Sequence, residues 1–140
     1  MADDALRSVS LTRTGTTTFE ATNARGGTVT MSSGSTEEFT PVELFLAAMA
    51  GCSAVDIDLL TTRLAEPESF AMSAAGAKVR DEDGNHMGPI TITVSVTFPE
   101  GPEGDAARER LPDAVARSRD RLCTVSRTVQ LPTPVTYQID

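Results

Sequence analysis

The sequence is poor in the residues that build metal and hydrolase sites. It has one histidine, His86, and two cysteines, Cys52 and Cys123, in 140 residues. Zinc sites made of cysteine and histidine need four protein ligands, or three and a water molecule. These residues supply only an incomplete set, and His86 falls in a polar segment, so we expect no metal. Hydrolases of the Cys-His or Ser-His-Asp kind are disfavoured for the same reason, because each would depend on His86.

Positive charge is scarce as well. Twelve lysines and arginines stand against 20 acidic residues, which gives a formal net charge of −8. Nucleic-acid phosphates are bound by clustered basic residues. Here the basic residues are scattered or alternate with acidic ones, so we expect no nucleic-acid partner.

Long apolar runs are missing. Residues 1–7 contain two aspartates and no apolar core, unlike a signal peptide. The longest apolar stretch, residues 44–52, is too short to span a bilayer. We therefore expect a cytoplasmic protein with no membrane partner. In that compartment the two cysteines should be reduced, and a disulfide between them would be transient or catalytic.

What is present indicates one α+β domain covering residues 1–140. The length suits a single domain with a hydrophobic core. Alternating and β-branched segments predict strands, and a polar loop is expected at 81–89. The expected strands are a three-stranded antiparallel meander over 8–32, then 70–80, 90–98 and a short last strand at 135–139.

The clearest helix start is at Thr40. Thr40, Pro41 and Glu43 form a capping box with proline at the first helical position. This helix should extend to about residue 64. Its first half, residues 44–52, is apolar nearly all the way round, so we expect a second subunit to cover part of it.

A second helical stretch should begin near residue 103. Pro112 is expected to interrupt it and start a new helix. The resulting order, βββ-α-ββ-α-β, predicts helices packed on one face of a mostly antiparallel sheet. The stripe expected to be buried is Leu111, Val115, Leu122, Val125 and Val129.

Two segments resemble the OsmC/Ohr superfamily. Residues 41–56, PVELFLAAMAGCSAVD, are similar to the helix that carries the first cysteine of that family, and residues 122–126, LCTVS, to its second-cysteine motif. The likeness covers essentially the whole chain, including the order of elements and the separation of the cysteines. From local sequence alone, each cysteine could equally be a small buried core residue.

The resemblance implies an intertwined homodimer and a reaction with organic hydroperoxides. Cys52 would attack the peroxide, and Cys123 would capture the resulting sulfenic acid as a disulfide. An external dithiol, supplied by a small molecule or a partner protein, would then reduce that disulfide. The resemblance implies no bound cofactor.

Peroxidases of the family also have an arginine and a glutamate that activate the first cysteine. Arg13 best matches that arginine, with Arg25 as a weaker candidate, and a guanidinium would lower the cysteine pKa. The glutamate is displaced by one residue to Glu43. Nine helical steps of about 100° place Glu43 opposite Cys52, which favours capping over catalysis. The chain therefore resembles the divergent OsmC-like branch.

Asp56 lies one turn beyond Cys52 on the same helix face. A carboxylate there would raise the cysteine pKa unless a cation intervenes. Three functions stay open: a thiol peroxidase, a non-catalytic dimer that binds or senses a small apolar or thiol-reactive ligand, and a structural dimer with inert cysteines.

Overall fold

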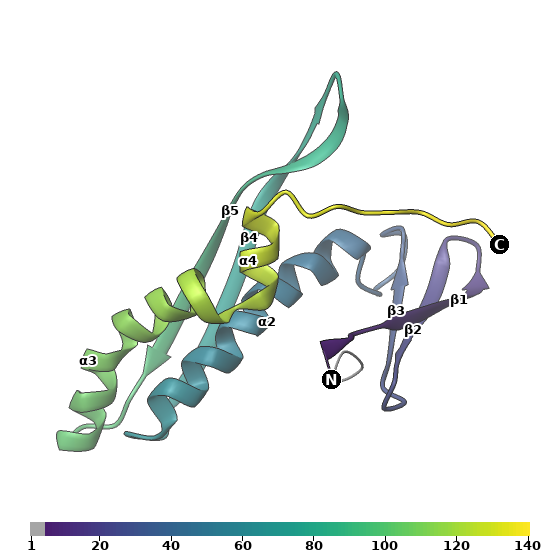
Figure 1. Ribbon diagram of the computed structural model, residues 1–140. Helices are drawn as coiled ribbons and strands as arrows, with labels where there is room; N and C mark the ends of the chain where they lie inside the picture. The colour runs from purple at the N-terminus through teal and green to yellow at the C-terminus, as the bar shows by residue number, and fades with distance from the viewer. Residues whose placement is uncertain (1–4) are drawn as a thin grey trace. The chain divides into compact units, whose positions relative to one another are not determined.

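The structure, a computed structural model, describes residues 5–140 and has an α+β fold with antiparallel sheets (Figure 1). The chain forms two compact units, Met1–Phe45 and Leu46–Asp140. The first unit contains a three-stranded sheet. The second contains a long hairpin and most of the helical residues.

The first unit is the predicted meander. Its strands pair antiparallel in chain order, with Arg13 opposite Phe19 and Phe19 opposite Met31. Gly26, with φ +90°, lies in the second turn, where a glycine adopts the left-handed backbone without strain. The meander predicted from alternation is thus confirmed. Its strands are β1 (Val9–Gly15), β2 (Thr18–Asn23) and β3 (Thr28–Ser32).

The capping box at Thr40 is also confirmed. The amide of Thr40 donates to Glu43 Oε1 at 2.8 Å, and the amide of Glu43 donates to Thr40 Oγ1 at 3.2 Å. The helix that starts here, α2, is Pro41–Thr62. It ends two residues before the predicted boundary, after Thr61 Oγ1 has bonded back to the carbonyl of Ile57 at 2.8 Å.

By length and composition alone, α2 could cross a membrane, with a mean hydropathy of 1.6 over 18 residues. The apolar stretch expected from the sequence, residues 44–52, was too short, because the apolar character of the helix continues through Val55, Ile57 and Leu59. The core helix of a globular protein passes the same test. Only 22% of that window is buried within the chain, so much of the helix surface is uncovered.

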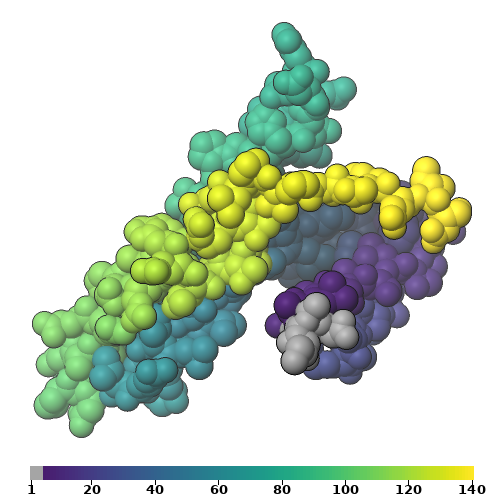
Figure 2. Space-filling view, in the orientation of Figure 1, coloured from purple at the N-terminus to yellow at the C-terminus, as the bar shows by residue number. Residues whose placement is uncertain are grey.

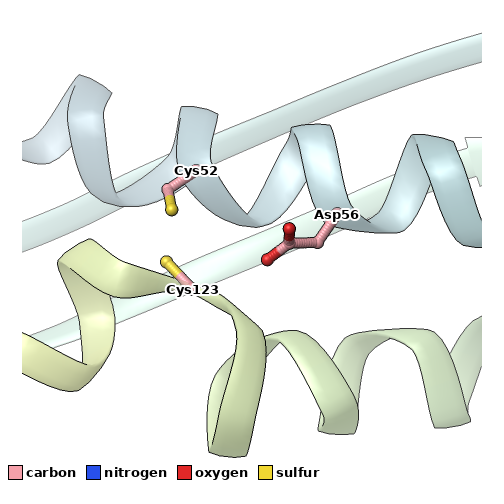
Figure 3. Close-up of side chains that lie close together, drawn as sticks. All are labelled: Cys52, Asp56 and Cys123. Atoms are coloured by element: carbon pink, nitrogen blue, oxygen red, sulfur yellow. The ribbon is translucent and has the colours of Figure 1, made fainter. Parts of the chain in front are cut away.

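The second sheet is a hairpin of β4 (Ser69–Asp81) and β5 (Gly84–Thr97). Phe70 pairs with Val96 and Met72 with Val94, so half-buried apolar residues share one face. Figures 1 and 3 show α2 and the C-terminal helices on the same side of this hairpin. The predicted polar loop at 81–89 was too long, because β5 already begins at Gly84.

The polar character of residues 84–89 has a structural explanation. The turn end of the hairpin projects from the rest of the second unit (Figure 2). Residues 76–81 and 84–86 are exposed on both faces of the hairpin, so polar residues occupy strand positions without burial, and only Met87 and Gly88 are half-buried. Polarity indicated a loop, although the backbone continues as paired strands.

The C-terminal helical segment differs from the prediction at Pro112. Helix α3 (Pro102–Arg117) continues through it. It is followed directly by the π-helical turn η1 (Ser118–Leu122) and then by α4 (Thr124–Gln130). The break between helices is thus at Cys123, where the backbone is extended.

The predicted buried stripe of this segment was wrong in part. Leu122 and Val129 are 43% and 44% exposed, and the other three members are half-buried. The reason is that η1 changes the helical period, so a stripe extrapolated from α3 rotates out of the core. The fully or nearly fully buried positions are smaller residues: Ala107, Ala114, Ser118, Cys123 and Ser126.

The predicted last strand at 135–139 is not formed. The structure assigns neither helix nor strand to residues 132–140. Val135, Tyr137 and Ile139 are 74%, 90% and 99% exposed. The alternation that predicted a strand is real, but a strand requires a hydrogen-bonded neighbour, and this segment has none within its own chain among the described residues.

Candidate functional site

Helix α2 carries two of the chemically active side chains of the second unit. Cys52 and Asp56 are one turn apart, so they project from the same face of the helix. Both are half-buried. Asp56 Oδ2 accepts a hydrogen bond from Ser118 Oγ at 2.8 Å. Ser118 is 1% exposed, so this bond fixes the carboxylate against a buried partner.

The third active side chain, Cys123, lies at the break between η1 and α4. Its backbone is extended, with φ −74° and ψ 102°, and its amide donates to the carbonyl of Ser118 at 2.9 Å. The Cys123 Sγ accepts a hydrogen bond from the amide of Ser126 at 3.3 Å. Cys123 is fully buried. The break thus holds the thiol in one orientation.

The three side chains converge although Cys123 is distant in sequence. Cys52 Sγ, Cys123 Sγ and a carboxylate oxygen of Asp56 all lie within 4.8 Å of one another. Figure 3 shows the two sulfur atoms pointing toward each other across the gap between α2 and the C-terminal segment. Both cysteines are free thiols.

The surroundings of Cys52 oppose its ionisation. Burial raises the pKa of the Cys52 thiol most, and its hydrogen bond with Cys123 and the negative charge of Asp56 raise it further. The backbone amide of Val125 acts in the opposite direction. Among the described residues, no arginine contributes to this pKa. The thiol in this arrangement is therefore predominantly protonated at neutral pH.

The other residues singled out from the sequence belong to other elements or have other local partners. Arg13 is an exposed residue of β1, and Arg25 is exposed in the turn after β2. Glu43 is engaged in the capping box, and the hydrogen bonds from Thr40 lower its pKa. These three residues belong to the first unit. His86 lies in the hairpin of the second unit, where its Nδ1 is 3.4 Å from Asp81 Oδ2, so it takes no part in the cysteine cluster.

Ser118 is a component of the site that sequence reasoning missed. It is separated from Asp56 by 62 positions, and no motif links the two. The only signal was indirect: a serine inside an otherwise helical segment needs a hydrogen-bond partner if it is buried. Asp56 was noted for its effect on Cys52, but its contact with the C-terminal segment was not predictable from helix periodicity.

The OsmC-like protein family matches this chain over residues 33–138. A chain from Mycobacterium tuberculosis, an uncharacterized protein, is 30% identical over 129 residues, which cover 91% of each chain. The family match includes both cysteine segments and more than half of the chain. It is long enough to establish the family.

Solved structures agree in fold. An OsmC-like protein of unknown function from Vibrio cholerae has a TM-score of 0.72 at 14% identity, covering 89% of this chain and 94% of its own. An organic hydroperoxide resistance protein OsmC from Legionella pneumophila has a TM-score of 0.57 at 15% identity, covering 89% of each chain. At these identities the similarity shows the fold alone.

Proposed function

This chain belongs to the OsmC-like protein family, and we propose that it reduces organic hydroperoxides with Cys52 and Cys123 as its redox pair. The observation that carries the proposal is the position of the two free thiols, whose sulfur atoms lie within 4.8 Å of each other. The name of the Legionella relative, a hydroperoxide resistance protein, supports the choice of substrate class.

The proposed reaction has two steps on the protein. The Cys52 thiolate attacks the terminal peroxide oxygen, the O–O bond breaks, and the alkoxide takes up a proton to leave as an alcohol. Cys52 is then a sulfenic acid. The Cys123 sulfur displaces its hydroxyl as water, which forms the Cys52–Cys123 disulfide. One peroxide is reduced and two thiols are oxidised, and an external dithiol, supplied by a small molecule or a partner protein, restores both.

The first step needs a cation near Cys52, since the groups now around the thiol raise its pKa. We assign that task to Arg13, whose guanidinium would stabilise the thiolate by approaching it when substrate binds. Glu43 is assigned to helix capping rather than to proton transfer, in keeping with its two hydrogen bonds to Thr40.

Mass spectrometry of the intact reduced protein, treated with cumene hydroperoxide, tests the proposal. The wild type should lose two hydrogens, because one disulfide forms. Cys123→Ser should instead gain one oxygen at Cys52, or more with excess peroxide. Cys52→Ser should stay unmodified by the same dose, and this variant is the matched control because it keeps the buried thiol of Cys123.

The competing function is a non-catalytic dimer that binds or senses a ligand. The raised pKa of Cys52 favours it, because a protonated thiol is a poor nucleophile. A wild type that keeps both thiols in excess cumene hydroperoxide, while remaining folded, would replace the peroxidase proposal with this one.

The first unit offers a place for such a ligand. A hollow of about 360 Å³ is lined there mostly by apolar side chains. A small apolar molecule would fit its volume and lining. The lining residues are Leu11, Thr17, Phe19, Met31, Ser32, Ser33 and Pro41.

A further inference from the structure

The cluster of Cys52, Cys123 and Asp56 has a second chemical capacity beside thiol oxidation. Two sulfur donors and one carboxylate oxygen converge on one small volume, all within 4.8 Å of one another. The donors around a tetrahedral zinc ion lie roughly 3.6–3.8 Å apart, given bond lengths of about 2.3 Å to sulfur and 2.1 Å to oxygen. Adjustment of the side-chain torsions would bring the three donors to that spacing.

From this geometry we propose that the reduced protein binds one Zn²⁺ through Cys52 Sγ, Cys123 Sγ and the Asp56 carboxylate. Thiolate donors select thiophilic ions, and a carboxylate is a normal third partner for zinc. Three protein ligands leave the fourth position for water or a small ligand. The half-buried Cys52 and Asp56 would leave that position accessible, while the fully buried Cys123 closes the opposite side.

The surrounding hydrogen bonds are those of a supported metal site. Ser118 Oγ donates to Asp56 Oδ2 at 2.8 Å, which orients the carboxylate. The amide of Ser126 donates to Cys123 Sγ, an interaction that stabilises a thiolate. The Ser126 bond is the N-cap hydrogen bond of α4, whereas Ser118 lies 62 positions from Asp56. The site is thus built from α2 and from the break between η1 and α4.

This proposal replaces the sequence-based expectation of no metal. That expectation counted only cysteine and histidine, and it tested His86 as the third ligand. The structure provides the third donor as a carboxylate, because α2 and the C-terminal segment bring Asp56 to the thiols. Zinc binding and disulfide formation exclude each other, because a disulfide between Cys52 and Cys123 leaves no thiolate to bind the ion.

The test is a titration of the reduced, chelator-treated full-length protein with Zn²⁺, followed by calorimetry. One ion per chain should bind. Asp56→Asn keeps an acceptor for Ser118 but removes the charged ligand, so zinc should bind at least about tenfold more weakly. Asp58→Asn, an exposed carboxylate two positions away on α2, is the matched control and should bind like the wild type.

Cobalt provides an independent readout. Co²⁺ in place of zinc should give a thiolate-to-metal charge-transfer band in the wild type and in Asp58→Asn. Cys52→Ser or Cys123→Ser should weaken that band, with circular dichroism confirming the fold. Equal affinity of Asp56→Asn and the wild type would overturn the three-ligand site, and so would a wild type that binds no zinc. No peroxide is present in these experiments, so a failure to bind zinc would not affect the test of thiol oxidation.

Discussion

Cys52 is surrounded by groups that favour its neutral form, and this has a consequence for pH dependence. Below the ordinary thiol pKa of about 8.5, Cys52 is protonated in both the folded and the unfolded state, and the stability linked to this site is fully present. Above that pH the unfolded state ionises before the folded state does. Stability is therefore lost until the pH has passed the raised pKa of the folded state. The free energy of unfolding of the metal-free protein should therefore fall above about pH 8.5.

Chemical denaturation at several pH values measures this fall. Cys52→Ser should flatten the profile between pH 8 and 10 relative to the wild type, because serine does not ionise there. The rate of Cys52 alkylation by iodoacetamide should rise with pH, with a midpoint above the ordinary thiol pKa. A midpoint below the ordinary thiol value would contradict the geometry and would indicate a cation near the sulfur.

Glu43 provides a second prediction about a single side chain. Its carboxylate accepts from the Thr40 amide, and glutamine can accept in the same place. Glu43→Gln should therefore leave the melting temperature and the rate of Cys52 oxidation nearly unchanged. A large loss of rate without loss of fold would show that Glu43 acts in proton transfer, where losses of about 10²-fold are typical.

Gly104 is required for the start of α3. A Cβ atom at this position would lie 1.7 Å from the carbonyl oxygen of Pro99, and the residue is buried. The neighbouring backbone would have to move, so Gly104→Ala should destabilise the protein by about 3 kcal/mol, the upper end of the range for overpacking. Glu103→Ala, an exposed neighbour, should cost little. Urea denaturation of both variants gives the comparison, and equal stabilities would contradict the packing at Pro99.

Helices and strands were predictable where local patterns decide the structure. The meander follows from alternation with turn residues, and the start of α2 follows from the side chains of Thr40 and Glu43. The hairpin strands were found by alternation as well, apart from their exposed ends. In each case the information lies within a few residues of the element it specifies.

Elements were mispredicted where their structure depends on a distant partner. Pro112 was expected to break α3, but it is exposed and the helix passes through it, so the break falls at Cys123 instead. The last strand was expected from alternation alone. A strand also needs a pairing edge, which residues 135–139 do not find within this chain among the described residues.

The candidate site shows the same limit. Cys52 and Asp56 were placed on one face by helix periodicity, and the resemblance paired Cys52 with Cys123. The contact between Asp56 and Ser118 joins residues 62 positions apart, and no periodicity specifies it. This is why a carboxylate beside two thiols was recognised as an influence on a pKa but not as a third metal ligand.

At the scale of the whole molecule, much of the surface of α2 is uncovered. A row with a spacing of four residues, Ala47, Gly51, Val55 and Leu59, is exposed along it. Val55 and Leu59 are 61% and 62% exposed. Burying such side chains stabilises a protein by about 1.5–3 kcal/mol each, so a partner is expected to cover them. The small residues of the row would allow that partner to approach closely.

We propose that a second copy of this chain buries the exposed row of α2. The row lies on α2, the helix that carries Cys52. The opposite side of α2 is already buried within the chain at Met49, Ser53 and Ile57. A membrane is the alternative, since α2 is long and apolar enough to span one. Asp56 argues against it, because its carboxylate lies within the helix, away from both ends, and is hydrogen-bonded to Ser118.

Sedimentation equilibrium at low micromolar concentration distinguishes these partners. The wild type should have the mass of a dimer, and Val55→Glu with Leu59→Glu should have the mass of a folded monomer, because two buried charges would cost more than the interface provides. Val79→Glu changes a partly exposed apolar residue on the hairpin and should remain dimeric. A monomeric wild type would contradict the homodimer. If that monomer also partitioned into phosphatidylcholine vesicles, and the double variant did not, α2 would be a membrane-contacting helix instead.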